Sequence, residues 1–296
     1  MISALLSAGA ADSMLKPELF ICPRCKSDGL IFDDSVIRCP DCQCEYKYDN
    51  GKYCFLTCEE VGATDPVDKL KSAFKRHWRL YTLLIKILSP VCPTGNLRSF
   101  LKRYVENKDV FAINLGSGNS KISDYVYNAD LIPYDNVHFV CDMESLPFAN
   151  GSVDVIINSA VLEHVPVPEA AVQEIHRVLR PGGLVYSYVP FIVGFHASPH
   201  DYSRWTLEGL KVLYGDFDPI MCKCAGGPTS GFLWVFQEWI SLLLSFGIRP
   251  LHTAIYFGVM VLTFPLKFVD WLLIHHPLAS NISSGFVFIG RKPPLA

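Results

Sequence analysis

The sequence lacks several features that would place it in a common class of protein. Its formal net charge is only −3 over 296 residues, so the chain as a whole has no cationic excess that would attract nucleic acid. It contains no internal repeat and no low-complexity tract. Residues 1–11 are mildly apolar but have no basic n-region, so we do not expect a secretory signal peptide.

A regular disulfide framework is also absent, although the chain has eleven cysteines. The number is odd, and four of them fall in two Cys-x-x-Cys pairs. This pattern favours metal ligation in a reducing compartment over the disulfides of a secreted protein. Half of the residues are hydrophobic, which is a large share for a soluble enzyme. The cysteine pattern therefore predicts a cytoplasmic protein. The large hydrophobic share leaves the cytoplasmic face of a membrane open as its location.

The two cysteine pairs are separated by thirteen residues and predict a metal-held module. Each pair can offer two thiolates to one tetrahedral zinc ion, at about 2.3 Å per Zn–S bond. Residues 30–32 and 36–38 are predicted as the strands of a hairpin between the pairs. A segment this short buries little apolar surface, so the metal would supply much of its folding energy. We predict a zinc-ribbon domain over residues 16–58, with structural Zn²⁺ bound by Cys22, Cys25, Cys39 and Cys42.

Two alternatives to this zinc site remain open. Cys44 could replace Cys42 as the fourth ligand, and the four thiols could instead form disulfides or stay free. The segment 20–56 resembles the zinc-ribbon family of tRNA-methyltransferase activator subunits, and related ribbons precede bacterial methyltransferase domains. Residues 16–60 contain six Lys or Arg and nine Asp or Glu. Phosphate binding needs a cationic excess, so we expect a structural or protein-contact role and no binding of nucleic acid.

Residues 65–108 are predicted as a basic amphipathic helical linker that ends its pattern at Pro90. At 100° per residue, one face is apolar and the opposite face is cationic. The linker either packs on the next domain with a solvated basic face, or lies in a membrane interface with its cations on anionic headgroups. The apolar face carries Leu70, Phe74, Trp78, Tyr81, Ile85 and Leu88. The cationic face carries Lys71, Lys75, Arg79 and Lys86.

A glycine-rich turn follows the first apolar strand, residues 110–115, of the next domain. Such a turn lets a ligand approach the backbone at the carboxyl end of a parallel sheet. A dinucleotide-binding fingerprint would have a third glycine where Lys121 stands, and an acid later than Asp130. A nicotinamide-dependent oxidoreductase is therefore disfavoured. The strands that follow alternate with helices or short crossovers, which predicts an α/β fold with a mostly parallel sheet.

The run from Asn114 to Gly183 resembles the type 11 branch of class I S-adenosylmethionine-dependent methyltransferases. Five segments match in the family's order along this run: Asn114–Gly118, Asp142–Phe148, Ser152–Asp154, Val161–Val165 and Glu174–Gly183. The resemblance implies a doubly wound, mostly parallel, seven-stranded Rossmann-like sheet over residues 109–296. It also implies S-adenosyl-L-methionine as the cofactor.

The resemblance further implies where the cofactor lies. The glycine turn would line its methionine end, Asp130 would bind the ribose hydroxyls, and Asp142 with Met143 would flank the adenine. Residues 159–163 would lie behind the sulfonium. Two features depart from the family: an amide replaces the common acid of the first strand, and only residues 120–125 remain for the first helix. The predicted contacts are Asn114, Gly116, Ser117, Gly118, Asp130, Asp142, Met143, Ser159, Glu163 and His164.

Polar and aromatic side chains are dense in residues 191–206, just after the fifth predicted strand. Methyl transfer is an in-line displacement, so it requires alignment and, for a protonated nucleophile, a base. His196, His200 and Tyr202 could remove that proton, and Arg204 could orient a carboxylate, phosphate or phenolate of the acceptor. The alternative role of each residue is to anchor the loop.

Residues 229–275 are predicted as an apolar helical insertion before the last strand, 286–292. Its two apolar segments, 231–246 and 251–264, are both shorter than the about 20 residues of a spanning helix. Trp234, Trp239 and Trp271 suit a headgroup boundary, whereas a capping subdomain or dimer interface is the alternative. We predict methyl transfer to a small-molecule or lipid-like acceptor with peripheral membrane contact. The alternatives are RNA or protein methylation guided by the ribbon, and a non-catalytic cofactor-binding scaffold.

Overall fold

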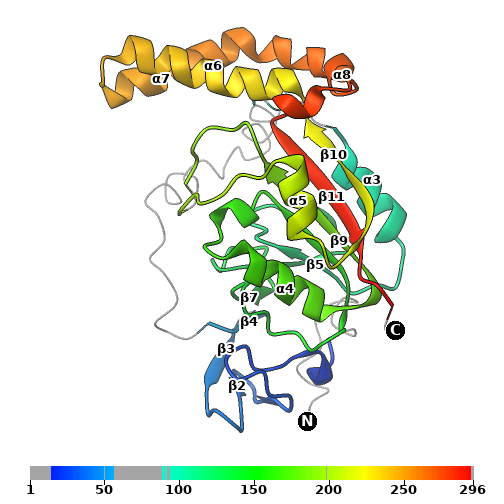
Figure 1. The fold of residues 1–296 in the computed structure, drawn as a ribbon. Helices are drawn as coiled ribbons and strands as arrows, with labels where there is room; N and C mark the ends of the chain where they lie inside the picture. The colour runs from blue at the N-terminus through cyan, green and yellow to red at the C-terminus, as the bar shows by residue number, and fades with distance from the viewer. Residues whose placement is uncertain are drawn as a thin grey trace.

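The computed structural model describes residues 15–49, 51–56, 89, 91, 94–197 and 199–294. Three parts are stacked along one axis: a small N-terminal β module, a central sheet flanked by helices, and a helical hairpin beyond one end of the sheet (Figure 1). The predicted faces of the linker, residues 70–88, lie outside the described residues. Its described end is helix α3 (Asn96–Tyr104).

Seven strands form the central sheet, in the spatial order β7-β6-β5-β8-β9-β11-β10. The first five run parallel, and β11 pairs antiparallel with both β9 and β10. This confirms the predicted mostly parallel α/β sheet. The strands are β5 (Ala112–Leu115), β6 (Tyr127–Asp130), β7 (Phe139–Val140), β8 (Val153–Ser159), β9 (Leu179–Pro190), β10 (Asp218–Gly226) and β11 (Gly285–Arg291).

The order of the strands reverses at β5, whose neighbours are β6 and β8. The chain first builds outward through β6 and β7, then returns to the other side of β5 for β8 and β9. In open parallel sheets, ligands bind at the carboxyl ends of the strands beside such a reversal. The loops after β5 and β8 are therefore the expected walls of the ligand site.

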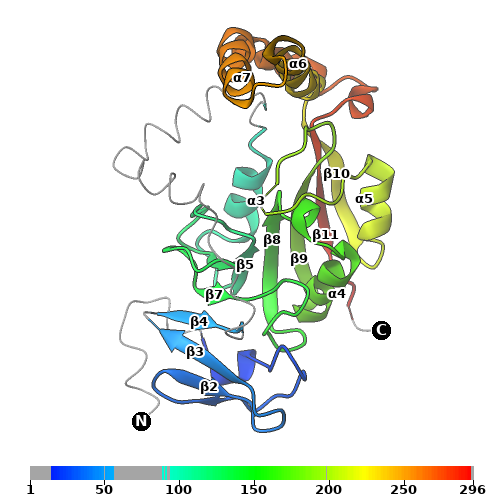
Figure 2. The ribbon, with the colours of Figure 1, turned by 90° about the vertical axis from the view of Figure 1, so that its left-hand side faces the viewer.

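Helices cover both faces of the central sheet (Figure 2). Helix α3 packs with Val155 and Ile157 of β8 on one face. Helices α4 (Pro168–Val178) and α5 (Leu207–Leu213) pack with Ile156 and the aromatic core on the other face. Successive residues of a strand point to opposite faces, so these continuously buried strands need apolar side chains at every position.

The N-terminal module extends the sheet instead of standing apart from it. Strand β4 pairs in parallel with β7, so that one eleven-stranded sheet runs through both parts. The predicted seven-stranded sheet is therefore extended by the four strands of the module, which the sequence did not indicate. Because β7 is a two-residue edge strand with unpaired backbone groups on one side, β4 satisfies those groups. The module's strands are β1 (Ile31–Phe32), β2 (Val36–Arg38), β3 (Glu45–Asp49) and β4 (Lys52–Cys54).

An aromatic cluster seals the junction between the module and the sheet. Phe20, which is 2% exposed, lies with its ring centroid 5.8 Å from those of Phe139 and Phe148. It also stacks on Tyr53 and Phe55 of the module, at 5.5 and 5.7 Å. Burying a phenylalanine side chain contributes about 1.5–3 kcal/mol, so the module and the sheet share one hydrophobic core.

A partly buried carboxylate, Glu174 on α4, adds a polar tie across the same junction. It accepts hydrogen bonds from Lys26 of the module at 2.8 Å, from Arg177 at 2.7 and 2.8 Å, and from the backbone N–H of Leu146 at 2.8 Å. Burial would raise the pKa of Glu174, but the hydrogen bonds from Arg177 and Lys26 outweigh it and lower that pKa. Ionised Glu174 therefore stabilises the folded state.

We predict that Glu174→Gln lowers the free energy of unfolding by about 2 kcal/mol at pH 7, because it leaves two cations without their partner. Since the folded pKa lies below the unfolded value of about 4.3, this loss is fully present above about pH 5 and shrinks as pH falls through the lowered pKa. Urea denaturation at several pH values measures both effects. The control is Glu208→Gln, which removes the exposed pair with Lys211 and should leave stability unchanged. Equal stability of Glu174→Gln and wild type at pH 7 would show that ionised Glu174 does not stabilise the folded state.

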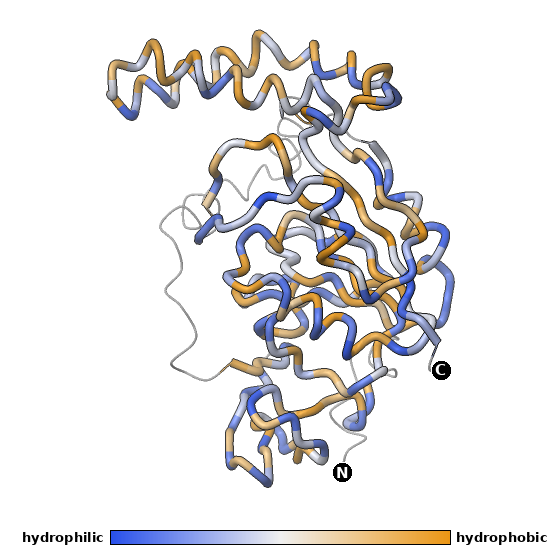
Figure 3. The backbone as a smooth tube through the Cα atoms, in the orientation of Figure 1, coloured by the Kyte–Doolittle hydropathy of each residue, from blue (hydrophilic) through white to orange (hydrophobic). Residues whose placement is uncertain are grey.

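The predicted insertion is a helical hairpin between β10 and β11. It comprises α6 (Pro228–Ser245), α7 (Arg249–Thr263), the 3₁₀ segment η6 (Phe264–Val269) and α8 (Asp270–Leu273). Because Gly226 of β10, Gly285 of β11 and Pro190 of β9 lie side by side, the hairpin leaves the sheet at the carboxyl ends of the parallel strands. Hydrophobic residues occur along both of its long helices (Figure 3).

The helical stretch Arg249–Leu273 is long and apolar enough to cross a membrane by length and composition alone. It spans 25 residues and contains an 18-residue window with a mean hydropathy of 1.5, and it is the one such stretch among the described residues. The two segments predicted from the sequence were shorter, because η6 and α8 continue α7 through two charged positions. Length and composition do not distinguish a spanning helix from an interfacial one.

Candidate cofactor and acceptor site

The glycine turn lies at the carboxyl end of β5, beside the reversal of strand order. Gly116 and Gly118 have φ of 63° and 53°, a left-handed conformation that favours glycine. A Cβ on Gly116 would lie 2.1 Å from Cγ2 of Val161, whereas one on Gly118 would meet no described atom within 4 Å. The turn is thus packed on one side and open on the other, as a backbone cradle for a ligand requires.

A strained residue holds Val161 over this turn. Ala160, directly after β8, has a φ of 54°, which is rare for a residue with a side chain. Its N–H donates to the carbonyl oxygen of Tyr188 at 2.9 Å, which fixes the bend. Strained backbone of this kind gathers at functional sites. No pattern in the sequence indicates that Val161 contacts Gly116.

Acidic residues follow β6 and β7 at the same edge. Asp130 ends β6, and its carboxylate accepts the N–H of Gly118 at 2.7 Å and that of Ile132 at 2.9 Å. Asp142 comes two residues after β7 and accepts the N–H of Glu144 at 2.9 Å. Met143 beside it is buried. The fold therefore gathers the predicted ribose and adenine contacts around the glycine turn, while their roles stay predictions.

The other predicted contacts take different positions. Asn114 is buried within β5 and donates to the side chain of Asn128 at 3.2 Å, so its amide helps to join two strands. Ser117 is buried within the turn, and its N–H donates to the carbonyl oxygen of Ala129 at 3.2 Å. Ser159 is the last residue of β8.

Glu163, His164 and His196 form a compact cluster behind the turn. Glu163 and His164 lie in the 3₁₀ turn η5 (Leu162–His164), and His196 comes from the loop after β9. Oε1 of Glu163 is 3.8 Å from Nε2 of His164 and 3.6 Å from Nε2 of His196. Glu163 is fully buried, and its carboxylate has no hydrogen-bond partner among the described residues. The sequence selected these residues for two different roles and did not place them together.

The other predicted acceptor residues mostly anchor the loop. Arg204 binds both oxygens of Asp201, with Nη2 2.7 Å from Oδ2, and it also reaches the carbonyl oxygens of Val193 and Gly194. The hydrogen bonds from Arg204 lower the pKa of Asp201 to about 2. Because these bonds use the guanidinium within the loop, the arrangement supports the anchoring alternative for Arg204.

His200 and Tyr202 are exposed on the same loop, with their rings 5.6 Å apart. The backbone of each supports the buried cluster: the carbonyl oxygen of His200 bonds Nδ1 of His164 at 2.5 Å, and the N–H of Tyr202 donates to the carbonyl oxygen of Glu163 at 2.7 Å. Neither side chain enters the cluster itself.

A cavity of about 300 Å³ opens between His196 and the helical hairpin. Trp234 of α6 brings its ring 6.0 Å from that of His196, and Tyr256 of α7 lines the opposite side. Glu238 and His252, which also line it, contact each other at 3.1 Å. The insertion therefore forms part of the wall of a cavity that borders His196.

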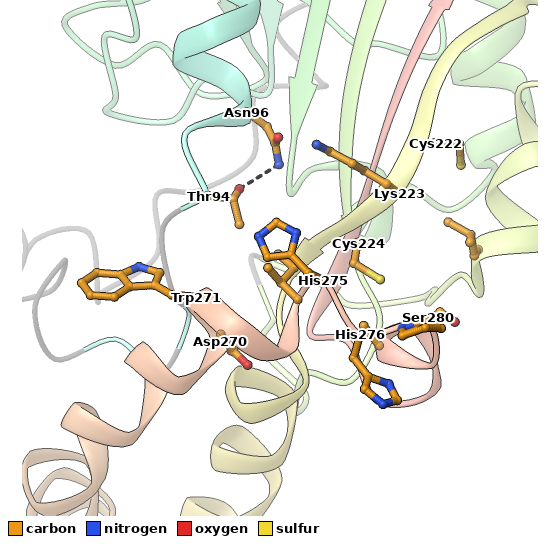
Figure 4. Close-up of a pocket in the computed structure, with 14 residues that line it drawn as sticks. Thr94, Asn96, Cys222, Lys223, Cys224, Asp270, Trp271, His275, His276 and Ser280 are labelled. Atoms are coloured by element: carbon orange, nitrogen blue, oxygen red, sulfur yellow. Dashed lines mark hydrogen bonds between the residues drawn. The ribbon is translucent and has the colours of Figure 1, made fainter.

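A larger cavity of about 550 Å³ lies elsewhere, between β10 and α8. Lys223, His275 and Trp271 project from its walls, and Asn96 donates to Thr94 at 2.8 Å at its edge (Figure 4). None of the predicted cofactor or acceptor residues lines it. Its size alone does not make it the reaction site.

The four predicted cysteine ligands come together in the N-terminal module. The sulfur atoms of Cys22, Cys25, Cys39 and Cys42 all lie within 4.8 Å of one another. Cys44 is outside this group, and its sulfur accepts a hydrogen bond from Arg24 at 3.1 Å. No disulfide joins the described cysteines. The geometry selects Cys42 over Cys44 as the fourth member of the cluster.

Comparisons with known proteins agree with this geometry. Residues 88–187 match the family model of the methyltransferase domain. An uncharacterized methyltransferase of Mycobacterium sp. (strain KMS) is 56% identical over 52 residues, which are 17% of this chain and 21% of the relative. A malonyl-[acyl-carrier protein] O-methyltransferase of Hahella chejuensis is 36% identical over 100 residues, 33% of each protein. The chain thus spans about a fifth to a third of the length of these curated relatives.

Solved structures show a more distant likeness. A complex of the Haloferax volcanii Trm112 methyltransferase activator with a methyltransferase is 14% identical, with a TM-score of 0.44, over 77% of this chain and 98% of that one. The predicted resemblance of the ribbon to the activator family stays a prediction. The matched domain, the strand order and the glycine turn at the reversal agree with one another and with the fold expected of a class I methyltransferase domain.

Proposed function

We propose that the chain transfers the methyl group of S-adenosylmethionine to a small-molecule or lipid-like acceptor at a membrane surface. The observation that carries the proposal is the open glycine turn at the strand reversal, where Gly116 packs on Val161, two residues before Glu163 of the cluster with His164 and His196. The glycine turn can hold the methyl donor, and the cluster of Glu163, His164 and His196 can act on an acceptor.

The residues present fit the cofactor. Gly118 has open space where a side chain would stand, so a ligand can reach the backbone. Asp130 at the end of β6 offers carboxylate oxygens to ribose hydroxyls, and Met143 offers apolar surface to the adenine. When bound, the cofactor would supply an electrophilic methyl group. The protein's own task is then to align the acceptor and to remove its proton.

The acceptor would occupy the cavity between the buried cluster and the hairpin. Phe195, Trp234 and Tyr256 line it with aromatic rings, which suit an apolar or ring-containing acceptor. The imidazoles of His164 and His196 lie within 3.8 Å of the carboxylate of Glu163. The acceptor would lose its proton at this cluster. The relative from Hahella chejuensis is named as an O-methyltransferase, which supports an oxygen nucleophile.

The hairpin supports the membrane part of the proposal because its polarity is inverted. One buried stripe of α6 carries small or polar side chains, and each is at most 2% exposed: Ser230, Gln237, Ser241 and Ser245. Large apolar side chains point outward, with Phe246 85% and Leu262 80% exposed. In water the hydrophobic effect favours the opposite arrangement, whereas small and polar helix contacts with an apolar exterior are typical of proteins in lipid.

Two of the four charged side chains in the hairpin, Lys267 and Asp270, are withdrawn from that exterior. Asp270 is buried and accepts the N–H groups of Thr229 and Ser230 at 2.7 and 2.8 Å, which caps α6. Lys267 is buried and donates to the carbonyl oxygen of Ser89 at 2.7 Å. A bilayer could therefore cover the outer face without burying either charge. A dimer interface or a soluble partner is the alternative occupant.

Flotation with anionic liposomes tests this docking. The full chain should rise with the vesicles, and the double variant Trp239→Ser/Leu243→Ser should reduce the bound fraction at least about tenfold, because each side chain loses about 1.5–3 kcal/mol of apolar burial. Val212→Ser is the matched control, since Val212 is 81% exposed on α5, outside the hairpin. A wild-type chain that stays at the bottom of the gradient would refute membrane docking.

Labelled methyl transfer tests the reaction itself. The chain is incubated with cell extract and methyl-labelled S-adenosylmethionine, and the organic and aqueous phases are then separated. We expect label in the organic phase only when the active chain is present. Label that appears only in RNA or protein would favour methylation guided by the N-terminal module, and no transfer to any fraction would favour a cofactor-binding scaffold.

The four-cysteine cluster is proposed as a structural zinc site. Sulfur atoms of Cys22 and Cys42, and of Cys25 and Cys39, are 3.5 Å apart, which suits thiolates that share one tetrahedral ion. The module presents no cationic excess, and its last strand completes the sheet. Its proposed role is therefore to support the methyltransferase domain.

A further inference from the structure

The carboxylate of Glu163 is the most costly polar group in the described part of the chain. It is 0% exposed, and neither of its oxygens has a hydrogen-bond partner there. Burying a charged carboxylate without a partner is strongly unfavourable. The fold nevertheless holds it in place through the backbone of Tyr202, which donates to the carbonyl oxygen of Glu163 at 2.7 Å. Such an arrangement calls for a cation beside the carboxylate.

Two imidazoles approach this carboxylate, each through its Nε2 atom. Nε2 of His164 and Nε2 of His196 lie 3.8 and 3.6 Å from Oε1 of Glu163. Nδ1 of His164 is 2.5 Å from the carbonyl oxygen of His200, and Nδ1 of His196 is 2.9 Å from that of Gly194. A carbonyl oxygen only accepts, so the tautomer that satisfies these two contacts has its proton on Nδ1 and directs the lone pair of Nε2 to the centre of the cluster.

The neighbouring charged groups do not occupy that centre. Asp201 is held by Arg204 and receives the N–H of His196 at 2.9 Å. Nη2 of Arg204 comes within 3.3 Å of Nδ1 of His196, on the side of the ring away from Glu163. The exposed ring of His200 stacks beside Tyr202. The Nε2 atoms of the two imidazoles therefore converge on the carboxylate of Glu163, both within 3.8 Å of its Oε1.

We propose that Glu163, His164 and His196 bind one divalent transition-metal ion. Their ligand atoms all lie within 4.8 Å of one another, and ligands about 2.1 Å from a tetrahedral ion are about 3.4 Å apart. Two imidazoles and one carboxylate suit Zn²⁺, Mn²⁺ or Fe²⁺ better than Mg²⁺ or Ca²⁺, which prefer oxygen ligands. The carbonyl oxygens of Gly194 and His200 orient the two rings, as outer-shell acceptors do at metal sites.

Three protein ligands leave coordination positions open, and His196 borders the cavity beneath the hairpin. This part of the inference rests on the proposed function: an acceptor hydroxyl would occupy an open position. The ion lowers the pKa of that hydroxyl, so its proton passes to solvent. The acceptor oxygen then forms a bond to the methyl carbon while the carbon–sulfur bond breaks, and its electron pair stays on sulfur. The acceptor is accordingly a phenol or another hydroxyl compound.

Titration of the full chain with Mn²⁺, followed by electron paramagnetic resonance, tests the site. Thiolates are poor ligands for Mn²⁺, so the cysteine cluster does not compete for the ion. We expect one bound Mn²⁺ per chain with nitrogen couplings from two imidazoles. His196→Asn should lose one coupling, and both His196→Asn and Glu163→Gln should weaken binding at least about a hundredfold. His275→Asn, an exposed histidine outside the cluster, is the matched control and should bind like wild type.

A thermal-shift measurement keeps the test valid if a variant is less stable. Mn²⁺ should raise the Tm of wild type and of His275→Asn but not that of Glu163→Gln, because only a folded site gains from the ion. Absence of bound Mn²⁺ in wild type, or equal binding by Glu163→Gln, would overturn the inference.

If Glu163→Gln instead weakened binding of S-adenosylmethionine but not of S-adenosylhomocysteine, the sulfonium would be the partner of Glu163, and the metal site would be rejected. Mn²⁺ binding without any binding of S-adenosylhomocysteine would reject only the proposed function.

Discussion

Replacing Gly116 by alanine is expected to weaken the binding of S-adenosylhomocysteine by at least about a hundredfold, or about 2.7 kcal/mol. The new Cβ would lie 2.1 Å from Cγ2 and 2.7 Å from Cβ of Val161. Val161 is β-branched, so it has few other rotamers and must move with its backbone. The φ of 63° adds about 1–2 kcal/mol of strain for a residue with a side chain. Movement of Val161 would also shift η5 and with it Glu163.

A matched glycine separates the clash from the backbone strain. Gly182 has a φ of 77°, but a Cβ there would meet no described atom within 4 Å. Gly182→Ala should therefore lose similar stability and keep its affinity for S-adenosylhomocysteine. Isothermal titration of both variants measures the difference. Wild-type affinity in Gly116→Ala would mean that the glycine turn does not hold the cofactor.

The second large effect is expected at the cysteine cluster. Cys39→Ser should remove one equivalent of zinc per chain and lower the Tm by about 10 °C or more, because metal binding supplies most of the folding energy of so small a module. Cys39 is 1% exposed, so the serine hydroxyl would also lie in the core. Loss of the module would uncover β7 and the ring of Phe139, against which Phe20 packs, and this extends the damage to the central sheet.

Elemental analysis and differential scanning calorimetry measure the two changes together. Cys54→Ser is the control, because Cys54 lies on β4 of the same module but outside the four-sulfur cluster. It should retain zinc and most of the wild-type Tm. If Cys39→Ser kept a full equivalent of zinc, Cys44 would be the stronger candidate for a ligand.

Much of the fold could be predicted because local signals agree with the final packing. The hairpin helices were expected at 231–246 and 251–264 and are found at 228–245 and 249–263. Their continuous apolar sequence and the break at Gly247 and Pro250 are independent of the rest of the chain. The predicted strands 110–115 and 286–292 likewise correspond to β5 and β11.

The joining of the module to the sheet could not be predicted. Strand β7 has two residues, Phe139 and Val140, and β4 has three. Pairing of such short strands depends on contacts between distant segments, here the rings of Phe20 and Tyr53 with Phe139. Neither strand carries a pattern that identifies its neighbour.

The composition of the site was predicted better than its arrangement. Glu163 and His196 were selected as a cofactor contact and a base, 33 positions apart, and no periodicity relates them. They meet because Asp201 and Arg204 bend the loop after β9 back toward η5. That bend also brings His196 to Trp234 of the hairpin. Tertiary structure decides such contacts, and a single sequence does not encode them locally.

Titration of the full chain with S-adenosylhomocysteine, and separately with NAD, tests the central claim most directly. We predict one saturable site for S-adenosylhomocysteine and no heat of binding for NAD, because the turn lacks the third glycine of a dinucleotide site. Binding of NAD alone, or of neither ligand at saturating concentration, would contradict the assignment of the glycine turn to a methyl donor.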